Sequence, residues 1–193
     1  MELILIRHGT TPGNLEHRFI GVTDHPLAPE GEELARAAAA KLPPVEHIYR
    51  SPLLRCEQTA ALLWPGVAET VIPELRETDF GCFEGKNHEE LKDDPLYIRY
   101  LREGDFSKVP VGESAEEAAA RAVRGLEKLV TDAAARGISR AGVVVHAGTI
   151  MGLLWRCGVP ARPGYYDWMC ANCGGYRVAV REDPLALEVL DSL

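Results

Sequence analysis

Two histidines, His8 and His146, each follow a short run of aliphatic residues and stand close to a glycine. His8 lies in LILIRHGTTPGN, residues 3 to 14, and His146 lies in GVVVHAGTI, residues 142 to 150. An imidazole has an ordinary pKa of about 6.5, so near neutral pH it can attack an electrophile, carry a proton or bind a metal ion. A lone histidine in such a place is more often a core residue, but the repeated arrangement favours a functional pair.

Two arginines narrow the chemistry that these histidines could serve. Arg7 directly precedes His8, and its fixed positive charge opposes a metal cation there; the sequence also has no H-E-x-x-H motif. A guanidinium at the end of a buried strand needs an anionic partner, either a protein carboxylate or a phosphate. Arg55 offers a second guanidinium, although alone it would more often be a surface residue. Together Arg7 and Arg55 could clamp a dianion.

The elements that must position these side chains can be predicted from hydrophobic patterning. Strand-like apolar runs occupy residues 3–6, 45–49, 69–72 and 143–145, with helical patterns between them. This alternation predicts a single α/β domain of three layers, in which helices flank a largely parallel central sheet. Ligands of such sheets bind beyond the carboxyl ends of the strands, where both histidines are expected. Backbone amides near glycine at these strand ends can face an anion.

Several helix ends carry recognisable capping residues. Ser51 is predicted to cap a helix whose first residue is Pro52, because proline loses no intrahelical hydrogen bond at that position. Ser114 and Glu117 form a predicted capping box for a long helix that Gly137 should end. We interpret this long helix as scaffold. A further helix is expected over residues 148–157, followed by two closing strands in YRVAVRED and LALEVL.

The segment from residue 86 to residue 110 is predicted to leave the sheet. It is polar at first and is interrupted by Pro95. Such an excursion can cover the ligand crevice of an α/β sheet, and an ordinary packed surface helix explains the same pattern equally well. The domain is therefore expected to span residues 1–193, with a substrate cover at 86–110 as an open alternative.

Composition excludes several functional classes. The 193 residues are 46% hydrophobic and 26% charged with a net charge of −8, which is typical of a globular domain and argues against a nucleic-acid surface. No stretch is apolar enough for a membrane span, and no secretory signal follows Met1, so we expect a cytoplasmic protein. Five cysteines predict free thiols. Cys170 and Cys173 form a C-x-x-C that lacks the second pair expected of a zinc site. The oligomeric state is not predicted.

Five blocks of the sequence resemble, in order and type, the motifs of the histidine phosphatase superfamily, which has the phosphoglycerate-mutase-like fold. They are RHGTTPGN, SPLLRCEQTA, LRETDFGCFEG, VGES and VVVHAG, and they cover almost the whole chain. The resemblance implies that His8 is the nucleophile and His146 its partner at the phosphate. It implies that Arg7, Asn14 and Arg55 bind phosphate and that Glu77 donates the proton, with Glu84 as second choice.

What the resemblance implies about the reaction is consistent with elementary chemistry. Phosphoryl transfer depends on positioning and on stabilising charge over the phosphate oxygens, so guanidiniums and amides can support it without a metal or another cofactor. The nucleophilic His8 must be neutral, and a hydrogen bond to its other ring nitrogen would select the attacking tautomer. Glu77 must begin protonated and later act as a base toward water.

The blocks depart from the commonest family pattern in two places. Thr10 replaces a glutamate or glutamine, and Ile20 stands where many relatives have threonine or glutamine. We expect Ile20 to affect a phosphate contact or the shape of the pocket. Other residues separate branches of the family. Members of the mutase branch share a tyrosine, a lysine and an adjacent arginine pair. At the corresponding places this chain has Phe80, His88 and the spaced Arg99 and Arg102.

The branch residues favour hydrolysis of a small phosphorylated metabolite. Several charge-assisted hydrogen bonds to a carboxylate are missing, each worth about 1.5–3 kcal/mol. The block pattern is similar to that of α-ribazole phosphatases and broad-specificity phosphatases, which makes α-ribazole phosphate one candidate substrate. A cofactor-dependent phosphoglycerate mutase is the first alternative. A catalytically poor protein that binds a phosphorylated ligand is the second.

Overall fold

A seven-stranded sheet forms the centre of the computed structural model, which describes residues 1–103, 109 and 111–193. The strand order is β3-β2-β4-β1-β6-β7-β5. Strands β3, β2, β4 and β1 run parallel to one another, and β6 is antiparallel to both β1 and β7. The strands are β1 (Glu2–Arg7), β2 (His47–Arg50), β3 (Glu69–Val71), β4 (Arg140–Val145), β5 (Gly158–Val159), β6 (Gly175–Glu182) and β7 (Leu185–Ser192). The predicted α/β fold with a mostly parallel sheet is confirmed.

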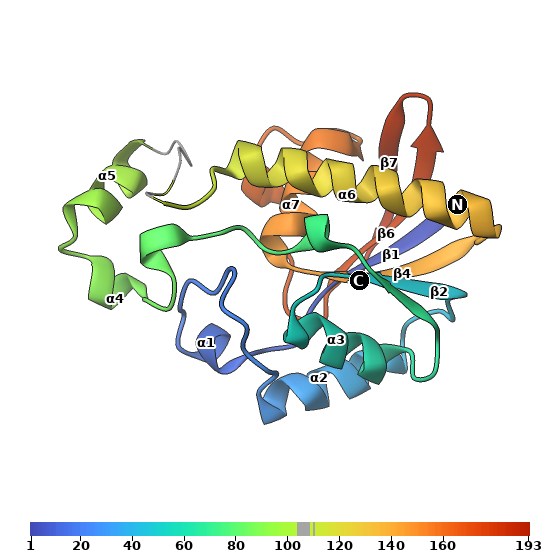
Figure 1. Cartoon of the computed structure of the whole chain (residues 1–193), viewed down its shortest axis with the longest axis horizontal. Coiled ribbons are helices and arrows are strands. Elements are labelled where there is room, and N and C mark those ends of the chain that lie inside the picture. Colours follow the sequence, from blue (N-terminus) through green and yellow to red (C-terminus); the bar gives the residue numbers. More distant parts are fainter. Residues whose placement is uncertain (104–108, 110) are drawn as a thin grey trace.

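Alternation along β1 fills two hydrophobic cores on opposite faces of the sheet. Leu3 and Leu5 join one core with residues of α6 (Ala115–Arg136) and α7 (Ala147–Cys157). Ile4 and Ile6 join the other core with residues of α2 (Pro29–Ala39) and α3 (Leu54–Leu63). Figure 1 shows α6 and α7 on one side of the sheet and α2 and α3 on the other. Burying each such side chain contributes roughly 1.5–3 kcal/mol, so β1 is anchored from both sides.

The long helix α6 has the predicted ends, whereas α3 does not. Ser114 and Glu117 form the capping box of α6, and Gly137 ends it in the left-handed conformation with φ of 68°. The predicted Ser51 cap is wrong, because α3 begins only at Leu54 and its N-cap is Leu53. Ser51 is fully buried, and its hydroxyl lies 2.7 Å from Nε2 of His146.

Residues 86–103 form a small helical lobe beside the sheet. It contains α4 (His88–Leu91) and α5 (Pro95–Glu103), which lie at the far left of Figure 1. Phe83, Leu91, Tyr97 and Val109 make its separate core. The rest of the expected 86–110 excursion, residues 104–108 and 110, lies outside the described residues.

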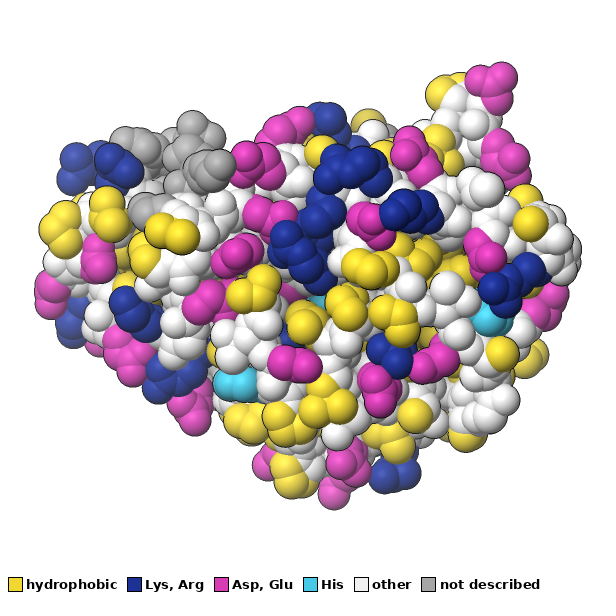
Figure 2. Space-filling view, in the orientation of Figure 1, with side chains coloured by type: hydrophobic (Ala, Val, Ile, Leu, Met, Phe, Trp, Pro, Cys, Tyr) yellow, Lys and Arg dark blue, Asp and Glu magenta, His cyan; other side chains and the backbone are white. Residues whose placement is uncertain are grey.

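The shorter elements are one α-helix and three 3-10 helices. They are α1 (Pro12–Leu15), η1 (Pro73–Leu75), η2 (Gly81–Phe83) and η3 (Tyr165–Trp168). Acidic and basic side chains are interspersed over the face shown in Figure 2. Within the described ranges, no helix has the length and apolarity needed to cross a bilayer.

Candidate active site

His8 stands at the carboxyl end of β1 with one ring nitrogen already engaged. Its backbone N–H donates to Val145 O at 2.9 Å, which ties it to the end of β4. Its Nδ1 lies 2.7 Å from Gly9 O, and a carbonyl oxygen can only accept, so Nδ1 carries the proton. Burial and the charge of Arg55 hold the His8 pKa well below its usual value, although the Gly9 bond opposes them. A neutral His8 therefore keeps its Nε2 lone pair.

His146 is the N-cap of α7, and its ring centroid lies 5.2 Å from that of His8. Arg55 Nε donates to its Nδ1 at 3.3 Å, so the proton of the neutral ring is on Nε2, which donates to Ser51 Oγ. Burial, followed by the charge of Arg55, lowers the His146 pKa well below its usual value. Two neutral imidazoles thus lie side by side.

Arg7 and Arg55 bring positive charge to these imidazoles. Arg55 is fully buried, and its Nη groups donate to Thr23 O at 2.9 Å and Gly21 O at 2.8 Å. Arg7 Nη1 donates to Cys170 O at 2.9 Å, and its buried Nε has no hydrogen-bond partner. In the described part of the chain, neither guanidinium forms an ion pair with a carboxylate. Two uncompensated cations beside two neutral histidines create a site for an anion.

Glu77 reaches this site from the loop after η1. Its Oε1 accepts from Thr78 N at 2.8 Å, and its Oε2 accepts from Gly148 N at 3.1 Å. A Cβ atom on Gly148 would lie only 2.3 Å from Glu77 Oε1. Because Gly148 has no side chain, the Glu77 carboxyl group can lie against the first turn of α7.

Glu84, the second choice for the acid, lies in a different environment. Its carboxylate accepts hydrogen bonds from the amides of Gly21, Val22 and Phe80 and from Thr23 Oγ1. These bonds hold the loop whose carbonyls receive Arg55. The Glu84 carboxylate therefore stabilises the conformation of this loop.

Some of these side chains line a cavity of about 240 Å³. Arg7, His8, Asn14 and Glu77 line it, whereas Arg55, His146 and Glu84 are not among its lining residues. Arg55 and His146 are fully buried, and the His146 ring lies 5.2 Å from that of His8. Apolar and aromatic side chains form much of the remaining wall, including Phe19, Phe80, Tyr100, Met151, Tyr165, Tyr166 and Met169. The anion end of the cavity is thus followed by a largely apolar space.

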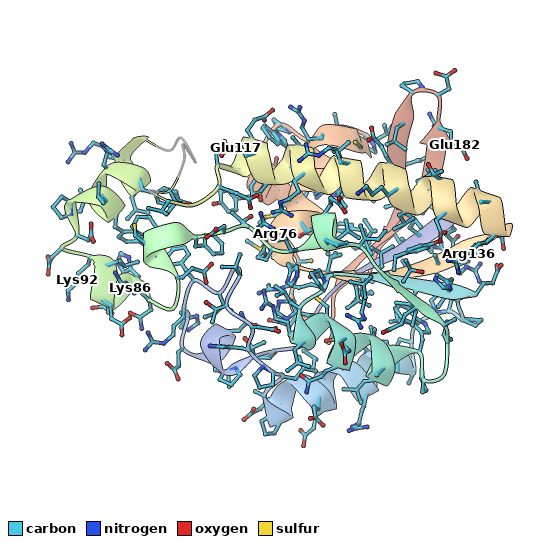
Figure 3. All side chains as sticks on the ribbon, in the orientation of Figure 1. Arg76, Lys86, Lys92, Glu117, Arg136 and Glu182 are labelled. Carbon is cyan, nitrogen blue, oxygen red and sulfur yellow. The ribbon has the colours of Figure 1, made fainter. Side chains whose placement is uncertain are left out.

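Arg121 is a buried residue of α6, the long helix that we interpreted from the sequence as scaffold. Its Nη1 donates to Glu74 O at 2.8 Å and Arg76 O at 2.7 Å, and its Nη2 donates to Glu77 O at 3.2 Å. Glu113, the glutamate of VGES, accepts from Arg121 and from Arg76, which is labelled in Figure 3. Burial alone raises the Glu113 pKa, but these partners outweigh it and hold the pKa at about 2. The cluster fixes the backbone that carries Glu77.

Comparison with known proteins identifies the family of this site. The sequence profile of the histidine phosphatase superfamily (branch 1) matches residues 3–192. The chain belongs to the histidine phosphatase superfamily. This confirms the predicted family, and membership supports the prediction of a phosphatase.

Solved structures share the superfamily fold. The crystal structure of the protein TTHB049 from Thermus thermophilus matches with a TM-score of 0.74 at 35% identity, over 100% of this chain and 99% of that one. The crystal structure of the α-ribazole phosphatase from Shigella flexneri matches with a TM-score of 0.84 over 100% and 96% of the two chains. Its identity of 24% shows a common fold alone.

A curated relative has a different name. The protein named Probable phosphoglycerate mutase GpmB from Enterobacter sp. (strain 638) is 35% identical over 127 residues, which are 63% of this chain and 59% of that protein. The chain therefore spans about three fifths of the length of this relative.

The departures from the superfamily pattern have distinct locations. Ile20 and Phe80 line the cavity, whereas Thr10, His88 and the two spaced arginines of α5 are not among its lining residues. His88 Nδ1 lies 3.2 Å from Tyr97 Oη, within the small helical lobe. Ile20 therefore brings an apolar side chain to the cavity wall.

The cysteines contribute to the site through their backbone. Cys170 and Cys173 have free thiols, and Cys173 N donates to Arg7 O at 2.9 Å. Burial raises the pKa of each of these thiols to about 11. Among the described residues, no group of three or more His, Cys, Asp or Glu side chains could hold a metal ion.

Proposed function

We propose that this chain is a metal-independent phosphomonoester hydrolase that acts through a phosphohistidine on His8. The observation that carries the proposal is the hydrogen bond from Nδ1 of His8 to Gly9 O, which leaves Nε2 as the nucleophile. Arg7 and Arg55 supply positive charge without a carboxylate partner among the described residues, and Asn14 lines the same cavity. The substrate is a small phosphorylated metabolite.

The reaction has two displacements at phosphorus. His8 Nε2 forms a bond to phosphorus while the bond to the leaving oxygen breaks, and Glu77 gives its proton to that oxygen. Water then attacks phosphohistidine, Glu77 takes a proton from the water, and the bond from phosphorus to His8 breaks to release inorganic phosphate. Arg7, Arg55 and Asn14 stabilise the charge on the phosphate oxygens in both steps.

His146 can act at the phosphate because its hydroxyl partner is adaptable. A phosphate that accepts the Arg55 Nε–H would release Nδ1 of His146 from its present hydrogen bond. Ser51 can then donate to Nε2 instead of accepting from it, which suits the other neutral tautomer of His146, with its proton on Nδ1. His146 would thereby gain a donor for a phosphate oxygen while staying neutral.

The cavity wall favours water over a phosphoglycerate as the phosphoryl acceptor. Among the described lining residues, the cation besides Arg7 is Arg18, which already pairs with Glu16 and Glu90. The described wall therefore lacks an unpaired cation for a substrate carboxylate. Its aromatic side chains suit a leaving group that carries a planar ring system, such as the base of α-ribazole phosphate. Phosphoglycerate mutase is the second candidate, favoured by the name of the curated relative. A cytoplasmic location stays a prediction of the sequence.

The leaving group provides the test of this mechanism. Glu77→Gln should slow hydrolysis of an alkyl phosphate by up to about 10²–10⁴, and of p-nitrophenyl phosphate far less, because a phenolate needs little protonation. Formation of the phosphorylated enzyme in a single turnover isolates the first step from attack by water. Glu84→Gln is the matched control and should show no such substrate dependence. If only Glu84→Gln shows it, the acid assignment is wrong.

The nucleophile and the reaction class are checked in the same assays. His8→Ala should abolish turnover, and mass spectrometry after a quench that avoids acid should find the phosphoryl group on His8 of the wild type. Excess chelator should leave the rate unchanged. Phosphoglycerate mutation faster than phosphate release would favour the mutase, and ligand binding without turnover would favour the binding protein.

A further inference from the structure

The loop that contains the C-x-x-C lies against the anion end of the site. Arg7 N donates to Gly174 O, and Cys173 N donates to Arg7 O, both at 2.9 Å. Arg7 Nη1 in turn donates to Cys170 O at 2.9 Å. This loop therefore holds the backbone and the side chain of Arg7. The remaining polar side chain of the motif belongs to Asn172.

Asn172 joins two residues of the proposed phosphate site. Its Nδ2 lies 3.0 Å from His8 O and 3.3 Å from Asn14 Oδ1. Asn14 is far away in sequence, on α1. One amide group of the loop thus bridges the nucleophile's backbone and a side chain that lines the cavity.

Two backbone groups determine which way both amides are turned. Thr11 N–H donates to Asn14 Oδ1 at 3.1 Å, so this end of the Asn14 amide is the acceptor. His8 O is also an acceptor. The Asn172 atom that faces both must therefore be the NH₂ group, which has two hydrogens for two acceptors. Turning either amide over would bring like groups together, so each amide fixes the other.

We propose that Asn172 is a positioning residue that keeps the Asn14 amide turned so that its NH₂ group is available to the substrate phosphate. The inference rests on the proposed function, in which Asn14 binds phosphate. With the opposite orientation, Asn14 would present its carbonyl oxygen to an anion, which repels it. Asn172 touches neither substrate nor reacting atoms and acts through Asn14.

Asn172→Asp tests the proposal because aspartate cannot donate to either acceptor. Its carboxylate instead attracts the NH₂ group of Asn14 and turns that amide away from the phosphate. Binding of inorganic phosphate, measured by calorimetry without turnover, should weaken by about 10-fold to 100-fold, the loss expected for one hydrogen bond to a charged group. KM should rise, while the ratio of alkyl to p-nitrophenyl rates should stay unchanged, because Glu77 is untouched.

The matched control is Asn87→Asp, which makes the same change outside the cavity. Asn87 is the N-cap of α4, where aspartate caps equally well, so phosphate binding should equal that of the wild type. Asn172→Ala provides a neutral variant, and it should weaken phosphate binding less than Asn172→Asp because Thr11 still holds Asn14. Thermal unfolding of each variant checks that the fold is retained.

A double-mutant cycle separates positioning from direct repulsion by the new charge. In an Asn14→Ala background, Asn172→Asp should change phosphate binding by less than about twofold, because the residue through which it acts is gone. An undiminished effect in that background overturns the proposal, as does wild-type affinity in Asn172→Asp itself. A wild type that neither binds phosphate nor hydrolyses esters would instead overturn the proposed function, and the inference with it.

Discussion

Gly148→Ala should separate catalysis from stability. The added Cβ would lie 2.3 Å from Glu77 Oε1 and 3.1 Å from Thr78 Oγ1. A carbon and an oxygen in contact normally stay about 3.3 Å apart, so the carboxyl group must retreat by about 1 Å. Such a displacement of a reacting group can cost about 10²-fold in rate. The carboxyl group ends a flexible side chain, so moving it costs the fold little.

The stability of the variant should stay close to that of the wild type. Alanine favours a helix over glycine by up to about 1 kcal/mol. The displaced carboxyl group loses its hydrogen bond from Gly148 N, which contributes about 0.5–1.5 kcal/mol. These two effects oppose each other. Urea unfolding should therefore give a free energy of unfolding within about 1 kcal/mol of the wild type.

The assay is formation of phosphorylated enzyme in a single turnover with an alkyl phosphate and with p-nitrophenyl phosphate. Gly148→Ala should slow the alkyl reaction by about 10² and the aryl reaction much less. Adding Gly148→Ala to Glu77→Gln should cost little more, because both changes act on one group. Equal loss on both substrates, or full additivity in the double variant, would refute the reasoning.

Two further predictions concern stability. Burial, followed by the charge of Arg55, lowers the pKa of His8 and of His146, so below pH 6.5 the unfolded chain takes up protons that the folded chain does not. When the pH is lowered from 6.5 to 5, the free energy of unfolding should decrease by up to about 1.4 kcal/mol per pH unit for each histidine. Urea titrations of His8→Asn should show a smaller dependence on pH. Arg121→Met should cost about 3–5 kcal/mol, because the carbonyls of Glu74, Arg76 and Glu77 lose their donor and Glu113 loses one of its two arginine partners. A loss under about 1 kcal/mol would contradict the role of this cluster.

Local patterns in the sequence predicted much of the fold. The apolar runs became β1, β2, β3 and β4. In β1, β2 and β4, alternate buried side chains fill two cores, whereas the short β3 lies at the edge of the sheet. The capping box at Ser114 formed as predicted, since its partners lie within one turn of helix. Ser51 carries the same type of side chain, but its hydroxyl has only a long bond of 3.4 Å from Leu53 N and a short one of 2.7 Å with His146, which is 95 residues away. The residue type of a predicted N-cap does not show that a distant side chain will bind its hydroxyl group.

The sequence proposed the candidate site by side-chain type, and the family resemblance ranked Glu77 above Glu84 as the acid, but the sequence showed no contact that explains this ranking. Glu77 and Glu84 lie in one motif, and only their partners distinguish them: the first receives two amides at the cavity, and the second receives the amides of a loop. Asn172 carries no signal of its own, because the pattern of its motif lies in the two flanking thiols. Arg121 resembles any other arginine of a scaffold helix in sequence, because its backbone carbonyl partners come from residues 74–77.

The roles that the sequence did not show have one physical cause. Backbone groups determine which atoms of the site donate hydrogen bonds and which accept them. Gly9 O fixes the His8 proton, Thr11 N–H acts together with Asn172 on the Asn14 amide, and Gly148 N–H fixes the Glu77 carboxyl group. Every residue except proline has these same backbone groups, so a motif of side chains does not reveal which of them will be used. A close approach leaves a trace in the sequence only where a Cβ would collide, as at Gly148. Substitutions that preserve every catalytic side chain can therefore still remove activity when they move the backbone that orients those side chains.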